Sequence, residues 1–188
     1  MAGIDVEPEH RLVPSFLLPN RANQLFTDLV EQVEWDASMK ARKTACYGET
    51  YDESGVDFEV REMHPLLAPV CEQIGEEVGF QPTNCLLNYY EDGQSTMGFH
   101  SDTISNLEDG TGIVIVSLGA ERSLTFRHKE NYELRHSYPL PNGSLFLMTQ
   151  RTQEFWMHAV KKASTDEPRI SITFRRILAE RKTDPDKE

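Results

Sequence analysis

Apolar residues recur every four positions in two segments of the first 80 residues. In 20–35 these are Leu25, Leu29 and Val33, and in 64–78 they are Leu66, Val70, Ile74 and Val78. This spacing places apolar side chains on one face of an α-helix. The pattern predicts a helix at 20–35 with Asn20 as its N-cap, and a helix at 64–78 that stops at Gly79.

After residue 80 the apolar runs become short, and Gly, Pro, Asn and Asp fall between most of them. Short runs bounded in this way are typical of β-strands. The predicted strands are 84–90, 113–118, 122–127, 132–138, 144–149, 155–160 and 169–177. Two helices followed by several strands, without β-α-β alternation, favour a mostly β chain of the α+β class. We expect a sandwich or barrel with the helices packed on one face.

The last predicted strand separates polar from apolar side chains by strict alternation. Ile170, Ile172 and Phe174 share one face, and the other face carries Arg169, Ser171, Thr173 and Arg175. In a barrel, the polar face can point outward to water or inward to an anionic ligand. The outward orientation is the more common one, so the pattern alone leaves both open.

Composition narrows the class of protein. The 188 residues are 38% hydrophobic and 27% charged, which is typical of a single globular domain, here 1–188. No apolar run approaches the ~20 residues of a membrane span, and the acidic start lacks the apolar segment of a secretory signal. The three cysteines include no C-x-x-C pair, which fits a reducing compartment. We therefore expect a cytoplasmic monomer without a membrane partner.

The charge is strongly acidic and uneven. The net charge is −12, and the first 100 residues carry 6 basic and 18 acidic residues. Proteins that bind nucleic acid through its phosphates normally carry a basic surface. Here any such surface is local, and the two candidate clusters are Lys40, Arg42 and Lys43, and Arg127, His128 and Lys129. Solvated surface charge is the more common explanation for short clusters of this kind.

Candidate chemistry is found at His100, Asp102 and His158. The first two residues are separated by one position, so in an extended chain both side chains lie on one face and can bind one ion. His158 lies in a predicted strand and is the candidate third ligand. Two histidines and one carboxylate form the facial triad of non-haem Fe(II) oxygenases, which leaves positions open for a cosubstrate and dioxygen. An H-x-D motif is common by chance, and a lone strand histidine is usually a packed residue, so the neighbouring residues matter.

Those neighbours are suited to binding a dicarboxylate. Arg169 and Arg175 lie about 20 Å apart along an extended strand. Each planar guanidinium can hold a carboxylate with two hydrogen bonds, so two inward arginines can hold opposite ends of a five-carbon diacid. Asn88 and Tyr90 share a face of their predicted strand and can add neutral donors.

Several ordered motifs together resemble the AlkB family of Fe(II)/2-oxoglutarate dioxygenases. They are Cys-Leu-Leu-Asn-Tyr-Tyr, Gly-Phe-His-Ser-Asp, Val-Ser-Leu-Gly-Ala, Phe-Arg-His-Lys, Asn-Gly-Ser-Leu and Pro-Arg-Ile-Ser-Ile-Thr-Phe-Arg. The likeness covers 83–177, and 41–48 looks like the substrate lid of the family's nucleic-acid-repair branch. It implies a double-stranded β-helix (jelly roll) at 81–178, a helical part with the lid at 1–80 and a frayed tail at 179–188.

The resemblance also implies roles for individual residues. The implied iron ligands are His100, Asp102 and His158. The implied 2-oxoglutarate contacts are Arg169 and Tyr90 at the distal carboxylate, Arg175 and Asn88 near the metal-chelating end, and Ser171, which replaces a common Asn but can still donate. The implied reaction consumes dioxygen, converts 2-oxoglutarate to succinate and hydroxylates the substrate. A hydroxylated N-methyl group then leaves as formaldehyde.

Three hypotheses remain open for what the site acts on. The first is oxidative demethylation of an N-alkylated nucleobase in DNA or RNA repair, with the Lys40–Lys43 cluster, including Arg42, at a phosphate and Tyr47 stacked on the base, unless Tyr47 packs on the core. The second is hydroxylation of a small molecule or a protein side chain. It is favoured by the net charge of −12 and by Ile104, a candidate substrate contact that stands where repair members often carry an acidic residue against the base. The third is a non-catalytic β-sandwich binding module.

Overall fold

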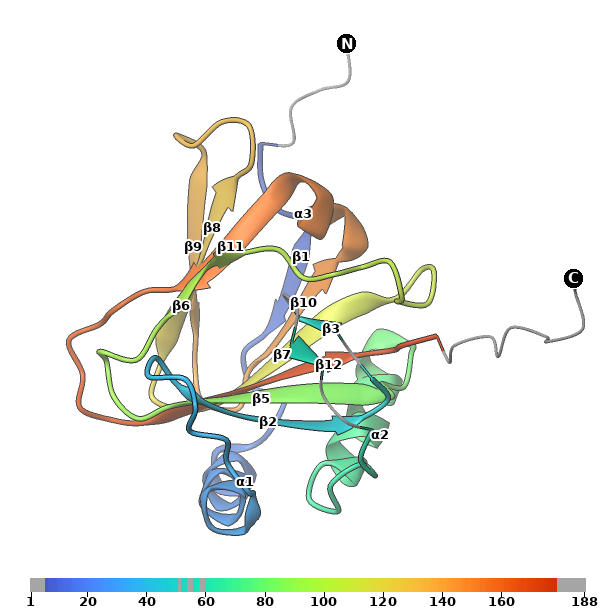
Figure 1. Cartoon of the computed structure of the whole chain (residues 1–188), viewed down its shortest axis with the longest axis vertical. Coiled ribbons are helices and arrows are strands. Elements are labelled where there is room, and N and C mark those ends of the chain that lie inside the picture. Colours follow the sequence, from blue (N-terminus) through green and yellow to red (C-terminus); the bar gives the residue numbers. More distant parts are fainter. Residues whose placement is uncertain (1–5, 51, 54–55, 58–59, 179–188) are drawn as a thin grey trace, which may run out of the picture.

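Two antiparallel sheets face each other in the computed structural model, which describes residues 6–50, 52–53, 56–57 and 60–178 (Figure 1). The six-stranded sheet contains, in spatial order, β1 (His10–Val13), β10 (Leu145–Thr149), β7 (Gly112–Gly119), β12 (Arg169–Arg175), β5 (Asn84–Tyr90) and β2 (Lys43–Gly48). The four-stranded sheet contains β6 (Met97–His100), β11 (Trp156–Val160), β8 (Arg122–His128) and β9 (Arg135–Leu140). A short hairpin, β3 (Asp52–Glu53) with β4 (Val56–Asp57), lies apart. The predicted jelly-roll architecture is confirmed.

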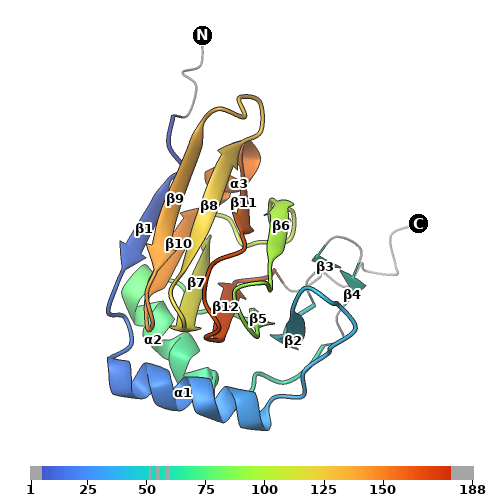
Figure 2. The ribbon, with the colours of Figure 1, turned by 90° about the vertical axis from the view of Figure 1, so that its left-hand side faces the viewer.

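Two helices, α1 (Pro19–Gln32) and α2 (Ala68–Val78), cover the face of the six-stranded sheet that points away from the four-stranded sheet (Figures 1 and 2). Their apolar faces supply the predicted periodic residues, such as Leu25 and Leu29 of α1 and Ile74 of α2. These side chains pack against Ile170 and Phe174 of β12 in one buried cluster. Within the described residues, no helix is both long enough and apolar enough to cross a bilayer.

Both helices begin at a proline turn rather than where the apolar period predicts. α1 is capped by Leu18 and has Pro19 in its first turn, so Asn20 is not the N-cap. α2 is capped by Leu67 and begins at Ala68 instead of residue 64, with Pro69 in its first turn. Proline suits a first helical turn, where its missing N–H is not needed. Gly79 ends α2 in the left-handed region, as predicted.

Several elements were not predicted from the sequence. β1 and β2 come from the first 80 residues, so the sheet begins before position 81. β6 and the six-residue helix α3 (Gln150–Phe155) were also missed, and β9 begins at Arg135 rather than at 132. The missed strands are short or lack a clear alternation of polar and apolar residues. They form because neighbouring strands pair with them, and no local pattern in the sequence indicates this. The expected frayed tail at 179–188 lies outside the described residues. The expected lid segment 41–48 lies within them and mostly forms β2 of the six-stranded sheet.

Candidate active site

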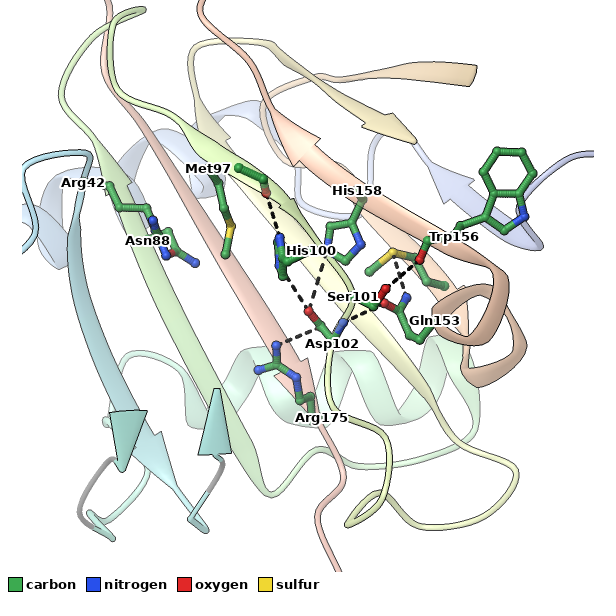
Figure 3. Close-up of polar contacts among 12 residues, drawn as sticks. Arg42, Asn88, Met97, His100, Ser101, Asp102, Gln153, Trp156, His158 and Arg175 are labelled. Carbon is green, nitrogen blue, oxygen red and sulfur yellow. Dashed lines mark hydrogen bonds and ion pairs between the residues drawn. The ribbon is translucent and has the colours of Figure 1, made fainter. Parts of the chain in front are cut away.

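Adjacent antiparallel strands bring the two candidate histidines together. His100 of β6 lies directly opposite His158 of β11 in the strand register, and Asp102 follows β6 by two residues. Asp102 Oδ1 is 3.4 Å from His100 Nε2 and 3.6 Å from His158 Nε2. One ligand atom from each residue lies within 4.8 Å of the others. Figure 3 shows the three side chains pointing toward one another, so the predicted triad forms a metal-binding group.

The protonation states of the triad suit a divalent cation. His100 Nδ1 is 3.0 Å from the Gly98 carbonyl oxygen, which can only accept, so Nδ1 carries the proton and Nε2 keeps its lone pair. Burial, aided by the neighbouring His100, lowers the pKa of His158 to about 3, which leaves this imidazole neutral. Burial alone would raise the pKa of Asp102, but Arg175 and the two histidines hold it well below its usual range. Two neutral imidazoles and a carboxylate are the forms in which these residues bind metal.

The polar face of β12 points inward. Its four polar side chains are buried and line a cavity between the two sheets together with the triad. They are Arg169, Ser171, Thr173 and Arg175. β12 is a central strand between β7 and β5, and its opposite face is covered by the helix-side core, so the outward orientation is wrong. The strand register places Arg169 opposite Tyr90 and Ser171 opposite Asn88, and both partners line the same cavity.

The two arginines mark the two ends of the cavity. Arg175 Nη2 donates to Asp102 Oδ2 at 2.8 Å, which places this guanidinium beside the metal-binding group. Arg169 Nη2 donates to Ser117 Oγ at 2.9 Å, and its Cζ lies 5.3 Å from the Tyr90 ring centroid. Burial lowers the pKa of Arg169 to about 10, so the side chain remains charged at neutral pH.

Arg169 provides the test of whether a dicarboxylate fits. Its Nε and Nη1 groups are buried and have no hydrogen-bond acceptor within the described part of the chain. A buried donor without an acceptor is costly, and a guanidinium is satisfied best by a carboxylate that accepts two hydrogen bonds. The cavity therefore combines a cationic anchor at one end with the metal-binding group at the other, which is the arrangement that 2-oxoglutarate requires.

The predicted substrate contacts fall in three different places. Arg42 Nε donates to Asn88 Oδ1 at 2.6 Å, so Arg42 lies beside the cavity (Figure 3). Tyr47 lies on the opposite face of the sheet, because its register partner Cys85 and Tyr47 itself belong to the helix-side core. The expectation that Tyr47 stacks on a substrate base is therefore wrong, and the alternative of core packing holds. Ile104 packs against the apolar cluster between the sheets.

Several residues that shape the cavity were not predicted from the sequence. Ser117 carries a hydroxyl that accepts from Arg169, and it is the one hydroxyl-bearing residue of the otherwise apolar strand β7. A single hydroxyl in such a strand is a pattern from which its role could have been predicted. Thr173 was placed on the polar face but not assigned to the site. Arg122 is buried, lies 5.8 Å from the Tyr90 ring centroid and donates to the carbonyls of Asp92, Ser95 and Lys161, which holds the loop before β6. No local pattern indicated that contact.

Two histidines and one carboxylate at the end of a jelly-roll cavity, with a buried arginine at the far end, define a non-haem iron centre of the facial-triad class. The family model of the 2OG-Fe(II) oxygenase superfamily matches residues 9–175. The chain belongs to the 2OG-Fe(II) oxygenase superfamily. It is thus an AlkB-like enzyme that uses Fe(II) and 2-oxoglutarate, not a non-catalytic binding module.

Curated relatives lie in the AlkB branch. The chain is 30% identical over 184 residues to the human DNA oxidative demethylase ALKBH2, covering 86% of this chain and 70% of that protein. It is 31% identical over 186 residues to the Bos taurus alpha-ketoglutarate-dependent dioxygenase alkB homolog 3, covering 88% of this chain and 65% of that protein. A solved structure of OsALKBH1 matches with a TM-score of 0.65 at 13% identity, covering 90% of this chain and 99% of that one, which supports the fold.

Proposed function

We propose that this enzyme removes alkyl groups from nitrogen atoms of nucleobases in DNA or RNA. When bound, Fe(II) and 2-oxoglutarate would supply the oxidation, in which 2-oxoglutarate is decarboxylated to succinate and CO2, one atom of dioxygen enters succinate and the other becomes the hydroxyl group on the target carbon. A carbon hydroxylated next to nitrogen is unstable, and an N-methyl group leaves as formaldehyde. The relatives described as a DNA oxidative demethylase support this substrate class.

The enzyme's own residues hold and orient the reactants. His100, Asp102 and His158 hold the metal, and Arg169 holds the distal carboxylate of 2-oxoglutarate while Arg175 lies beside the metal-bound end. Arg175 also fixes the Asp102 carboxylate, which keeps one oxygen directed at the histidines. The cavity lies between the two sheets and most of the side chains that line it are buried, which limits the access of bulk water to it.

The likeness to a DNA oxidative demethylase carries the nucleic-acid substrate. An aromatic and cationic surface on the outer face of the four-stranded sheet, which points away from the triad, adds a place where a nucleic-acid strand can bind. We call Phe99, Arg127, Tyr132 and Lys161 the stacking platform. Arg127 Cζ lies 4.3 Å from the Phe99 ring centroid and 4.5 Å from that of Tyr132, and Lys161 Nζ lies 5.4 Å from Phe99. Phe99 immediately precedes the ligand His100 in β6, so its side chain points to the opposite face of the sheet. Aromatic rings with adjacent cations bind single-stranded nucleic acid through bases and phosphates together.

Arg42 adds a second cationic group near the cavity. Its side chain is half-buried and fixed by Asn88, which lines the cavity. In contrast, the neighbouring Lys43 is neutralised by Glu91, with 2.7 Å between Nζ and Oε1. Arg42 is therefore the member of the predicted Lys40–Lys43 cluster best suited to contact a phosphate of a nucleotide in the cavity.

A second candidate function is hydroxylation of a small molecule or a protein side chain. The net charge of −12 favours it, because a strongly acidic chain repels polyanions at long range. Ile104 also favours it, because an apolar side chain that packs between the sheets cannot hydrogen-bond a base.

Succinate release separates the two candidates. We expect N-methylated oligonucleotides to stimulate Fe(II)-dependent succinate release more than the unmethylated oligonucleotide or free metabolites. If a metabolite or peptide stimulates release and methylated oligonucleotides do not, the second candidate is correct.

The stacking platform can be tested separately by binding. Arg127→Gln should weaken oligonucleotide binding and reduce the slope of log affinity against log salt by about 1. The matched control is Arg21→Gln, which removes the same charge from an exposed position on α1. Equal effects of the two substitutions would show only a general charge effect and would remove this support.

A further inference from the structure

The loop 101–111, which carries the Asp102 ligand, is held by side chains from the short helix α3. This loop connects β6 with β7 and has no strand pairing of its own at Asp102. α3 connects β10 of one sheet with β11 of the other and leads directly into the strand of His158. We infer that Gln153 of α3 is a positioning residue that sets the orientation of Asp102 toward the metal.

Gln153 is the contact closest to the ligand. Its Oε1 accepts the Asp102 backbone N–H at 2.9 Å, and both residues are buried (Figure 3). The amide is itself fixed, because Gln153 Nε2 lies 3.5 Å from Met148 Sδ. The Gln153 carbonyl also accepts from Lys129 Nζ at 2.6 Å, which ties α3 to the end of β8. The acceptor oxygen therefore has little freedom to move away from Asp102.

A second contact fixes the residue just before the ligand. Ser101 Oγ donates to the Trp156 carbonyl oxygen at 2.9 Å, at the first residue of β11. Together with Gln153, this contact attaches the start of the loop to the segment that carries His158. The relative position of two metal ligands thus depends on hydrogen bonds between segments about fifty residues apart.

The far end of the same loop offers an internal comparison. Gln150, also on α3, donates through Nε2 to the carbonyl oxygens of Glu108 and Thr111 at 2.9 and 3.0 Å. Gln150 and Gln153 thus hold the same loop from the same helix with the same side-chain type. They differ in distance from the ligand, because Gln153 bonds Asp102 itself.

Loss of the Gln153 acceptor would leave the Asp102 N–H buried and unpaired. The loop would rotate to satisfy it, and the carboxylate would lose its alignment with the histidines. Loss of a hydrogen-bond partner that orients a metal ligand typically lowers metal affinity by about 10- to 100-fold. We therefore expect Gln153→Met to weaken Mn(II) binding by that factor, whereas Gln150→Met should change it less than about threefold. Methionine has nearly the length of glutamine and packs well beside Met148.

The test is a Mn(II) titration of the metal-free proteins followed by electron paramagnetic resonance, with urea unfolding of each variant in parallel. A merely structural role would lower the unfolding free energy without changing the affinity of the folded fraction. Equal Mn(II) affinity in folded Gln153→Met and wild type would overturn the inference, and so would equal losses in both variants.

Amide hydrogen exchange in the wild-type protein provides an independent measurement if Gln153→Met does not fold. The Asp102 amide should exchange as slowly as amides of β12 in the metal-free protein. Exchange at the rate of an open loop would show that Gln153 does not hold Asp102 in solution, and would also overturn the inference.

Discussion

The two faces of the six-stranded sheet carry the same backbone but opposite chemistry. On the helix side, Ile170, Ile172 and Phe174 of β12 are fully buried among other apolar residues. On the cavity side, Arg169 and Arg175 of the same strand are just as buried but are charged. The helix side can therefore supply stability through apolar burial, whereas the cavity side holds buried charge that is costly unless it is paired, as Arg175 is with Asp102 and as Arg169 would be with a bound carboxylate.

Substitutions of neighbouring residues of β12 should therefore have different effects. A substitution on the helix side should change the free energy of unfolding and leave ligand affinity intact. A substitution on the cavity side should change ligand affinity and leave the free energy of unfolding nearly intact. The expected outcomes below begin with the largest effect.

Removal of a metal ligand on the cavity side should have the largest effect. His100→Ala deletes one of three ligands, so we expect Mn(II) affinity to fall by more than about 100-fold and succinate release to become undetectable. Unfolding by urea should change little, because His100 is partly exposed. Retained turnover would refute the assignment of His100 as a metal ligand.

On the helix side, Phe174→Ala should destabilise the protein by about 3–5 kcal/mol, because a fully buried aromatic ring is replaced by a cavity. Urea unfolding measures this change. The affinity of the remaining folded protein for 2-oxoglutarate should match wild type. A large loss of that affinity in folded protein would mean that the two faces are not independent.

On the cavity side, Arg169→Met should weaken 2-oxoglutarate binding about 100-fold, which corresponds to about 2.7 kcal/mol. Stability without ligand should stay equal or rise, because an incompletely paired buried charge is replaced by an apolar chain. Isothermal titration and urea unfolding test the two parts. Loss of Mn(II) binding instead would show that the role of Arg169 is misassigned.

The smallest expected effect is the pH dependence of the free energy of unfolding. The pKa of His158 is about 3 in the folded protein because of burial and about 6.5 in an unfolded chain, so only the unfolded state takes up a proton between these values. The free energy of unfolding of the metal-free protein should therefore fall with decreasing pH below about 6.5, by at most about 1.4 kcal/mol per pH unit. The lowered pKa of Asp102 adds a loss in the same direction only below about pH 4.

Urea unfolding at pH 7 and pH 5 measures this dependence. His158→Gln cannot take up the proton and should show a shallower dependence than wild type in this range. Equal slopes would show that His158 is not buried as a neutral imidazole.

Residues whose role follows from local spacing could be predicted from the sequence. The separation of His100 and Asp102 by one residue placed both on one face, and alternation in 169–175 grouped the two arginines. These inferences need only the period of an extended chain. The resemblance to the AlkB family then decided the inward orientation of the polar face, which alternation alone left open.

Residues whose role depends on strand register or distant contacts could not be predicted in this way. Tyr47 lies on the helix side because β2 pairs with β5 in a register that brings it opposite Cys85, and no local pattern specifies that register. Gln153 acts across 51 positions, on a helix too short to show a period. The starts of α1 and α2 were wrong because proline geometry overrode the apolar period.

Strand β12 is hydrogen-bonded along both edges, to β5 and to β7. Sliding it along its axis would break pairing on both sides, so the two ladders fix where Arg169 and Arg175 stand relative to Tyr90 and Ser117. Both cationic side chains are therefore delivered to the cavity by backbone that cannot shift on its own.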